Sequence, residues 1–181
     1  MVGKFSVFIL SFFLLATQSQ PKVIVFYGDS LTAGYGLSPT EAFPALIESK
    51  IKNAGKNYRV VNAGLSGETS AGGLSRLDWV IRQPVDVFVL ELGANDGLRG
   101  LPTAETRKNL QAIIDKVKAK NPQVKLVLAG MMVPPNMGAD YANDFKKIYP
   151  ELAKVNHAKL FPFLLKDVAG IEKLNQADVI H

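Results

Sequence analysis

Residues 23–31 read Val-Ile-Val-Phe-Tyr-Gly-Asp-Ser-Leu. The first five are β-branched or aromatic, and a short run of this kind predicts a buried strand. A glycine, an aspartate and a serine follow directly, and these residue types favour a turn and the start of a helix. The stretch therefore predicts a strand whose carboxyl end passes straight into a turn that carries Ser30.

The rest of the chain repeats this alternation of apolar runs and helical segments. Further strands are expected at residues 59–62, 85–92, 125–129 and 160–164. Helices are expected at residues 41–54, 74–82, 103–120 and 144–154. Strands that alternate with helices form a parallel sheet covered by helices on both faces. The sequence thus predicts an α/β domain whose site lies beyond the carboxyl ends of the strands.

Length and composition narrow the class of protein. A chain of 181 residues with 48% hydrophobic residues suits one domain with a sizeable core. It has no cysteine, which excludes disulfides and thiolate chemistry. The formal net charge is +5, but the lysines are spread among acids and form no dense basic tract with interleaved aromatics. We therefore expect no nucleic-acid partner.

The first 19 residues have the layout of a secretory signal peptide. Lys4 gives a positive start, residues 5–16 are almost wholly apolar, and residues 17–19 are polar or small. The apolar stretch is shorter than the roughly 20 residues that a transmembrane helix needs. We expect a signal peptide at residues 1–19 and one folded domain at residues 20–181, periplasmic or secreted. An uncleaved membrane anchor is the alternative, because the residues after the apolar segment lack the Ala-x-Ala pattern that is typical of a signal-peptide cleavage site.

Residues suited to chemistry follow three of the expected strands. Ser30 follows the first, Gly64 the second and Asn95 the third. Parallel strands end at one edge of a sheet, so we expect these residues to lie together. Taken singly, Ser30 could be a helix N-cap, Gly64 a residue needed for backbone freedom and Asn95 a turn residue. Together they suit acyl transfer, with a serine nucleophile and donors for an oxyanion.

An aspartate and a histidine complete this set. Asp178 precedes His181 by three residues, a spacing that lets the carboxylate reach the ring on a turn or short helix. The carboxylate would hold Nδ1–H and leave Nε2 free to take the serine proton. The other histidine, His157, is expected to be an exposed residue without a role. Since His157 and the scattered acids show no ligand spacing, we expect no metal site.

Four sequence blocks carry a family resemblance. Gly-Asp-Ser-Leu at 28–31, Asn-Ala-Gly-Leu-Ser-Gly-Glu-Thr at 62–69, Gly-Ala-Asn-Asp at 93–96 and Asp-x-x-His at 178–181 resemble, in order, the blocks of the GDSL or SGNH hydrolases. Their order and spacing resemble the small thioesterase/lysophospholipase/arylesterase branch. The resemblance implies a flavodoxin-like three-layer sandwich with a five-stranded parallel sheet of order 2-1-3-4-5. It also implies a serine esterase mechanism without a cofactor.

The resemblance assigns a role to each candidate residue. Ser30 would be the nucleophile, with Asp178 and His181 as the rest of a catalytic triad. The backbone amides of Ser30 and Gly64 and the side chain of Asn95 would bind the oxyanion.

The loop after the fourth strand is a candidate for substrate binding. It contains Met132, Pro134, Pro135 and Asn136. Prolines stiffen such a loop, and methionine gives an adaptable apolar wall. In the branch that this chain resembles, the loop lines the acyl pocket. The alternative is ordinary core and turn.

Two features depart from the family pattern. Val179 stands where the last block commonly has glycine. The family also continues past the histidine with a proline and a closing helix, so we expect the domain at residues 20–181 to lack that helix.

The expected function is that of a serine hydrolase that cleaves carboxylic esters, and also thioesters, with apolar acyl groups. Its partner would be a small-molecule ester or lipid, and transient contact with a membrane surface is left open, as is the oligomeric state. Two alternatives remain at this point, a carbohydrate O-deacetylase and a non-catalytic lipid- or glycan-binding relative.

Overall fold

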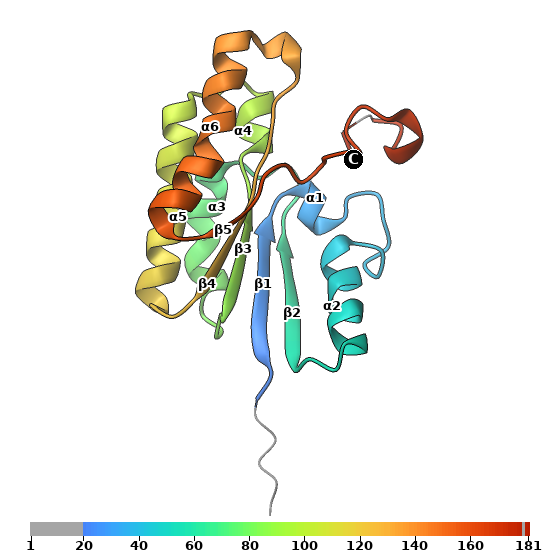
Figure 1. Ribbon diagram of the computed structural model, residues 1–181, viewed down its shortest axis with the longest axis vertical. Coiled ribbons are helices and arrows are strands. Elements are labelled where there is room, and N and C mark those ends of the chain that lie inside the picture. Colours follow the sequence, from blue (N-terminus) through green and yellow to red (C-terminus); the bar gives the residue numbers. More distant parts are fainter. Residues whose placement is uncertain (1–19, 179) are drawn as a thin grey trace, which may run out of the picture.

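The computed structural model describes residues 20–178 and 180–181 (Figure 1). The signal peptide expected at residues 1–19 lies outside them. The strands are β1 Lys22–Gly28, β2 Tyr58–Gly64, β3 Val87–Glu91, β4 Lys125–Ala129 and β5 Lys159–Phe161. The helices are α1 Ser30–Ala33, α2 Phe43–Asn53, α3 Ser70–Val80, α4 Ala94–Leu98, α5 Thr103–Lys120 and α6 Ala139–Asn156, with 3₁₀ turns η1 Pro135–Met137 and η2 Glu172–Leu174. No helix in this part of the chain is both long and apolar enough to cross a membrane.

The strands form one five-stranded sheet in the order β2-β1-β3-β4-β5, and every pair is parallel. The predicted α/β class and the 2-1-3-4-5 order are therefore confirmed. β1 lies between β2 and β3, and its last residue, Gly28, is aligned with both Gly64 and Glu91. The first three strands thus end at one level, which brings the segments after them to one edge of the sheet.

One face of the sheet carries the main core. Helices α3, α5 and α6 cover it (Figure 1) and pack their apolar side chains against β1, β3 and β4. Leu77, Ile113 and Ile114 from the helices are fully buried, as are Val25 and Phe88 from the strands. Each such side chain contributes about 1.5–3 kcal/mol relative to an exposed one.

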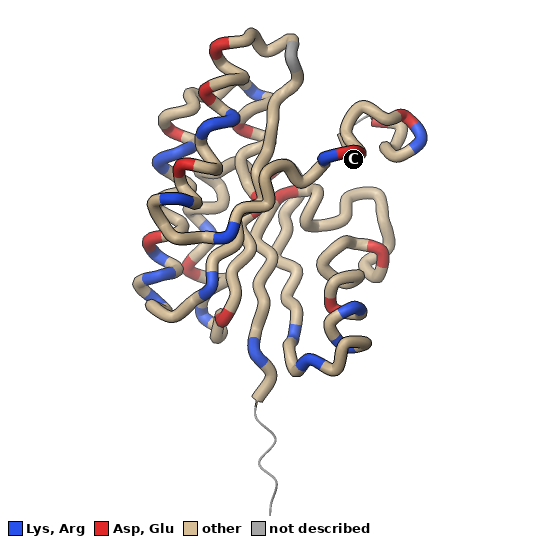
Figure 2. Tube along the Cα trace, viewed as in Figure 1, with Lys and Arg blue, Asp and Glu red and all other residues tan. Residues whose placement is uncertain are grey.

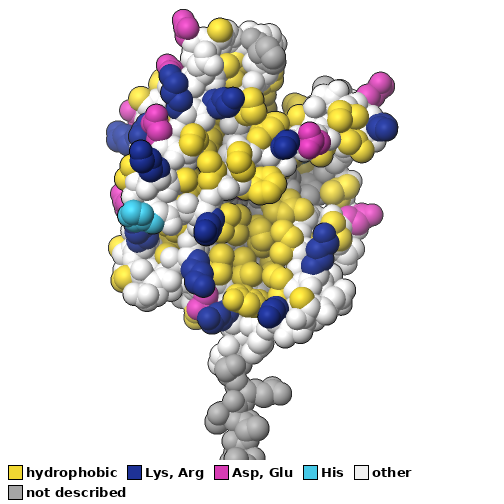
Figure 3. Space-filling view, viewed as in Figure 1, with side chains coloured by type: hydrophobic (Ala, Val, Ile, Leu, Met, Phe, Trp, Pro, Cys, Tyr) yellow, Lys and Arg dark blue, Asp and Glu magenta, His cyan; other side chains and the backbone are white. Residues whose placement is uncertain are grey.

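The opposite face is only partly covered. Here α2 lies over β1 and β2, and the Phe43 ring meets the edge of Phe26 at a centroid distance of 5.4 Å. The register places Val87, Val89 and Val127 on the same face as Phe26, and these valines are only half-buried. Figure 3 shows apolar side chains gathered over the strands beside α2. Within the described residues, the expected helical cover is complete on one face and partial on the other.

Some element bounds differ from those expected. α6 begins at Ala139 and not at residue 144, because the turn before it ends at Gly138, whose φ of 90° favours glycine. β5 ends at Phe161 and not at residue 164, because Pro162 has no N–H to continue the ladder. The short helices α1 and α4 are not predicted by periodicity, since four or five residues are too few to show it.

Charges of both signs alternate along α5 and α6 (Figure 2). Lys116 Nζ lies 2.8 Å from a carboxylate oxygen of Asp78, and Lys147 Nζ lies 3.0 Å from one of Asp144. Exposed pairs of this kind each contribute little to stability. They do mean that lysines on these helices have acidic neighbours.

Candidate active site

Ser30 occupies the turn between β1 and α1, at the carboxyl edge of the sheet. It is the first residue of α1, so its backbone N–H has no partner within the helix. The N-cap of α1 is Asp29, whose Oδ1 accepts a hydrogen bond from the Leu31 N–H at 3.1 Å. Because Asp29 caps the helix, Ser30 is not needed for that structural role. Its half-buried side chain is left available for chemistry.

Asp178 and His181 form the pair that their spacing predicts. Asp178 Oδ2 lies 2.6 Å from His181 Nδ1, and Oδ1 accepts the backbone N–H groups of Ile180 at 3.1 Å and His181 at 3.0 Å. The hydrogen bond from the His181 side chain, followed by these two amides, lowers the pKa of the Asp178 carboxyl to about 2. Asp178 is therefore an anion at neutral pH and fixes Nδ1 of the imidazole as the protonated nitrogen.

His181 presents its other nitrogen to the interior. Nε2 is buried and has no hydrogen-bond partner in the described part of the chain. The ring packs against Tyr35 with a centroid distance of 4.8 Å, and Gln176 Nε2 donates to the Tyr35 carbonyl at 2.7 Å. The Tyr35 N–H in turn donates to the Ser30 carbonyl at 3.0 Å, so the residue that packs on the imidazole is bonded to the segment that carries Ser30.

The structure therefore brings the three triad candidates to one region without closing the triad. Asp178 and His181 are hydrogen bonded, whereas no hydrogen bond joins Ser30 to His181 among the described residues. Catalytic hydrogen bonds are often long or absent in ligand-free enzymes and tighten on substrate binding. An imidazole held by a carboxylate in this way can activate a serine hydroxyl as a nucleophile once the two come within hydrogen-bond distance.

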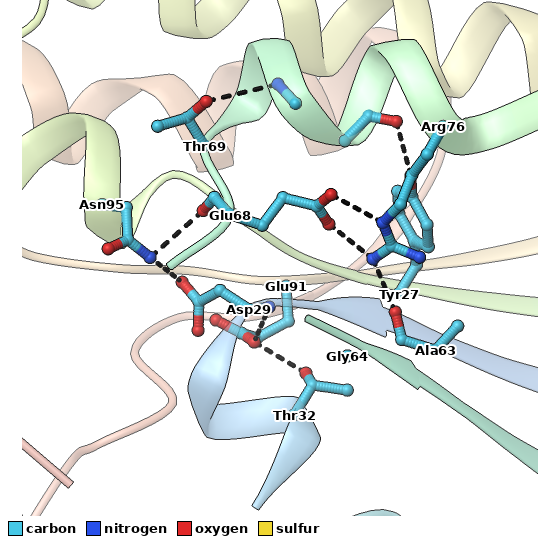
Figure 4. A network of polar contacts seen from close by, with 12 residues as sticks. Tyr27, Asp29, Thr32, Ala63, Gly64, Glu68, Thr69, Arg76, Glu91 and Asn95 are labelled. Carbon is cyan, nitrogen blue, oxygen red and sulfur yellow. Dashed lines mark hydrogen bonds and ion pairs between the residues drawn. The ribbon is translucent and has the colours of Figure 1, made fainter. Parts of the chain in front are cut away.

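Two of the candidate oxyanion donors, Gly64 and Asn95, lie at the same edge, but their hydrogens are already bonded. The Gly64 N–H donates to Asn62 Oδ1 at 2.9 Å. Asn95 Nδ2 donates to the Glu68 carbonyl at 3.1 Å and to Asp29 Oδ2 at 3.3 Å (Figure 4). The second of these bonds is long, so one hydrogen of Asn95 is only weakly held.

Position 64 also requires glycine for a purely steric reason. A Cβ there would lie 2.2 Å from the backbone nitrogen of Ala33. Asn62 Nδ2 also donates to the Thr32 carbonyl at 2.9 Å, which ties α1 to β2. Close approach of α1 to β2 therefore requires glycine at position 64, whatever its amide does.

Two buried acids that the sequence analysis did not assign to the site lie directly behind Ser30. Asp29 and Glu91 are both buried acids, and Glu91 Oε2 accepts the Asp29 N–H at 3.2 Å. Burial raises the pKa of Asp29 to about 6, against hydrogen bonds from Leu31 and Asn95 that lower it. The sequence does contain a sign of the role of Glu91, because it places an acid within an apolar strand, and a fully buried acid rarely lacks a partner.

A partly buried ion pair supports the loop on the other side of Asn95. Arg76 donates from Nε to Glu68 Oε1 at 2.6 Å and from Nη2 to the Ala63 carbonyl at 2.7 Å (Figure 4). Its guanidinium also lies over the Tyr27 ring, 4.4 Å from the centroid. Because the Glu68 carbonyl accepts from Asn95, this pair fixes where the Asn95 amide points.

A further buried acid, Asp96, fixes helix α4, which carries Asn95. Asp96 accepts the Ser70 N–H at 2.7 Å and the Ser70 hydroxyl at 2.5 Å, and Thr106 Oγ1 at 3.3 Å. These bonds join α4 to the starts of α3 and α5. The sequence predicts Asn95 as a candidate but gives no sign of this support.

The loop after β4 lies at the same edge as Ser30, as its place in the chain predicts. Met132, Pro134 and Asn136 are exposed, and Val133 packs toward Gly97 in α4. No hydrogen bond or ring contact links Met132, Pro134 or Asn136 to Ser30 in the described structure. Their part in substrate binding stays a prediction.

Fold and site together define an α/β enzyme with the groups for acyl transfer at the carboxyl edge of its sheet. The chain belongs to the GDSL-like lipase/acylhydrolase family, whose sequence model matches residues 26–181.

Curated relatives and a solved structure support this family assignment. Esterase TesA of Pseudomonas aeruginosa is 38% identical over 173 residues, which cover 95% of this chain and 85% of that protein. Thioesterase 1/protease 1/lysophospholipase L1 of Escherichia coli K12 is 40% identical over 159 residues, 87% of this chain and 74% of that protein. The crystal structure of AlinE4, an SGNH-hydrolase family esterase, superimposes with a TM-score of 0.84 at 42% identity, covering 91% of this chain and 88% of that one.

The raised pKa of Asp29 predicts a particular pH dependence of stability. Its folded value of about 6 exceeds the ordinary 3.8, so the folded protein binds this proton more tightly than the unfolded chain. The stability from Asp29 is then full below about pH 3.8 and is lost as pH rises through about 6. Between these limits the unfolding free energy of the wild type should fall relative to that of Asp29→Asn by roughly 2–3 kcal/mol. Urea unfolding at a series of pH values measures this, and parallel profiles for the two proteins would contradict it.

Proposed function

We propose that the protein is a serine esterase and thioesterase that acts on small-molecule esters or lipids with apolar acyl groups. The observation that carries this proposal is the Asp178–His181 pair, with Nδ1 held at 2.6 Å and Nε2 buried and unpaired near the β1–α1 turn. An imidazole oriented in this way can accept a proton from a serine hydroxyl.

In the proposed mechanism Ser30 Oγ attacks the acyl carbon while Nε2 of His181 takes the hydroxyl proton. A tetrahedral intermediate forms, with a negative charge on the former carbonyl oxygen. Its C–O or C–S bond then breaks, and the leaving alcohol or thiol receives the proton from His181. Water repeats the sequence on the acyl-enzyme and releases the carboxylic acid. Asp178 stabilises the imidazolium that forms twice in each cycle.

The oxyanion would be bound by the Ser30 N–H, the Gly64 N–H and the Asn95 amide. In the structure, the Gly64 N–H is bonded to Asn62, and the Asn95 amide is bonded to Asp29 and to the Glu68 carbonyl. We propose that the oxyanion takes over the Gly64 hydrogen because it is a stronger acceptor than the neutral amide oxygen of Asn62, and one hydrogen of Asn95 because the bond to the Asp29 carboxylate is long. The long 3.3 Å bond to Asp29 makes Asn95 the easier donor to recruit.

Replacing Asn95 with alanine should therefore lower kcat by about 10²–10³, the usual loss for one oxyanion donor, with a smaller change in KM. Steady-state hydrolysis of a p-nitrophenyl ester measures both constants. Asn121→Ala is the matched control, because it removes an amide near the amino ends of the strands. A change in KM alone would assign Asn95 to binding of the ground state.

Substrate choice would depend on the loop with Met132, Pro134, Pro135 and Asn136, which we propose as one wall of the acyl site. The test is a panel of p-nitrophenyl acetate, p-nitrophenyl octanoate, an acyl-CoA and an acetylated polysaccharide. Preference for octanoate and turnover of the acyl-CoA support the proposal. Turnover of the polysaccharide alone would identify a carbohydrate O-deacetylase, and no turnover of any of them would identify a non-catalytic relative.

We also propose that the protein acts in the periplasm or outside the cell, after removal of residues 1–19. The layout of that segment supports the proposal. N-terminal sequencing of the exported protein tests it, and a mature chain that still begins at Met1 would contradict it.

A further inference from the structure

One fully buried carboxyl group lies directly beneath the turn that carries Ser30. Glu91, the last residue of β3, is 0% exposed. Its Oε2 accepts the Asp29 N–H at 3.2 Å and the Thr32 hydroxyl at 2.6 Å (Figure 4). These two donors stand on either side of Ser30 in the sequence. One oxygen atom thus anchors both flanks of this residue.

The turn is shaped to receive this carboxyl group. A Cβ on Gly28 would lie 2.3 Å from Glu91 Oε2 and 2.1 Å from Thr32 Oγ1. Gly28 is not among the glycines with a positive φ. Glycine is therefore required at position 28 by lack of space and not by the backbone conformation. The absence of a side chain at position 28 is what lets Glu91 reach the turn.

We propose that Glu91 is the positioning residue for Ser30, and that its acceptor oxygen holds the serine where its hydroxyl can attack. This inference rests on the proposed function of Ser30 as nucleophile. A serine misplaced by about 1 Å loses on the order of 10²-fold in rate, so two anchors on its flanks matter for turnover more than for binding.

The surroundings of Glu91 favour its uncharged form. Burial, and then the charge of Asp29, raise its pKa well above the usual range, and hydrogen bonds from Thr32 and from the Asp29 amide only partly oppose this. From α6, the Tyr149 hydroxyl donates to the Leu92 carbonyl at 2.9 Å and not to Glu91. A neutral acid still accepts both hydrogen bonds through Oε2.

Three variants test the inference in assays of p-nitrophenyl ester hydrolysis. Glu91→Gln keeps an acceptor oxygen and is always neutral, so its kcat should stay within about threefold of the wild type. Glu91→Leu keeps the bulk but has no acceptor, and its kcat should fall by about 10–100-fold with KM within about twofold. Ile113→Val, a core substitution in α5, is the control for lost stability and should keep the wild-type kcat. Near-UV circular dichroism establishes that each variant is folded.

The inference is overturned if folded Glu91→Leu keeps the wild-type kcat, or if Glu91→Gln loses as much as Glu91→Leu. Should Glu91→Leu fail to fold, Thr32→Val decides, because it removes one of the two anchors and nothing else. A fall in kcat of about three- to tenfold at constant KM supports the inference, and an unchanged kcat overturns it.

Two further measurements separate this inference from the proposed function. A wild type without ester hydrolysis, or a Ser30→Ala variant that retains it, would refute the proposed function and with it the inference. A wild type with activity that depends on Ser30, together with a fully active Glu91→Leu, would refute the inference alone. Infrared difference spectra of the wild type against Glu91→Gln should also show the carbonyl band of a protonated carboxylic acid at neutral pH, and a carboxylate band there would contradict a neutral Glu91.

Discussion

Ser30→Ala should abolish nearly all ester hydrolysis, with a loss in kcat on the order of 10⁴–10⁶. The reason is that the proposed acyl-enzyme forms on the hydroxyl of Ser30, which stands at the start of α1, beyond the carboxyl end of β1. The fold should be unaffected, because Asp29 and not Ser30 caps the helix. Steady-state rates with a p-nitrophenyl ester and mass spectrometry of the protein after a fluorophosphonate treatment measure the effect.

Ser38→Ala is a matched control for Ser30→Ala. Ser38 is an exposed serine whose hydroxyl donates to Glu41 at 2.6 Å, and its loss should leave turnover unchanged. A phosphonate adduct on wild-type Ser30 that is absent from Ser30→Ala would add direct evidence for the nucleophile. Wild-type turnover by Ser30→Ala would exclude the proposed mechanism.

His181→Ala should be almost as severe, with kcat reduced on the order of 10⁴-fold or more, since the base and the later acid are then missing. The reduction should be larger than that for Asp178→Asn, which leaves an imidazole in place but removes the charge that orients it. Small imidazoles added to His181→Ala should restore part of the rate, because the side-chain deletion leaves space beside Tyr35.

The second histidine provides the control for His181→Ala. His157 caps the end of α6 in a left-handed conformation with φ of 53°, which asparagine tolerates. His157→Asn should therefore fold and keep full activity. Equal losses in His157→Asn and His181→Ala would argue against a specific role for His181.

The sheet was predictable because its signals are local and repeated. The apolar run at residues 23–27 and the segments that alternate after it specify parallel strands, and the family resemblance supplies their order. Helix α5 was predicted with its bounds, because its apolar stripe ends at Asn121-Pro122. The start of α6 was not, since its first turn has few apolar residues and depends on the conformation of Gly138.

The sequence predicts which residues belong to the candidate site, but it does not predict most of the hydrogen bonds between them. The spacing of Asp178 and His181 predicts a pair, and the structure confirms their hydrogen bond. That the Gly64 amide already binds Asn62, and that Asn95 binds Asp29, depends on side-chain directions that no spacing encodes. Contacts between residues distant in sequence follow from tertiary packing, which periodicity does not describe.

Gly28 has a consequence for how this motif can vary among related chains. The glycine that opens Gly-Asp-Ser-Leu is held in place by a carboxyl group contributed from β3, since any side chain at position 28 would collide with it. A shorter side chain at position 91 would not by itself make room for alanine at position 28, because the added Cβ would also lie 2.1 Å from Thr32 Oγ1 and 2.6 Å from the backbone carbonyl oxygen of residue 91. An engineer who wished to diversify the motif would keep glycine at position 28 and vary the other positions, because part of the steric barrier is the backbone of the neighbouring strand β3, which no side-chain choice removes.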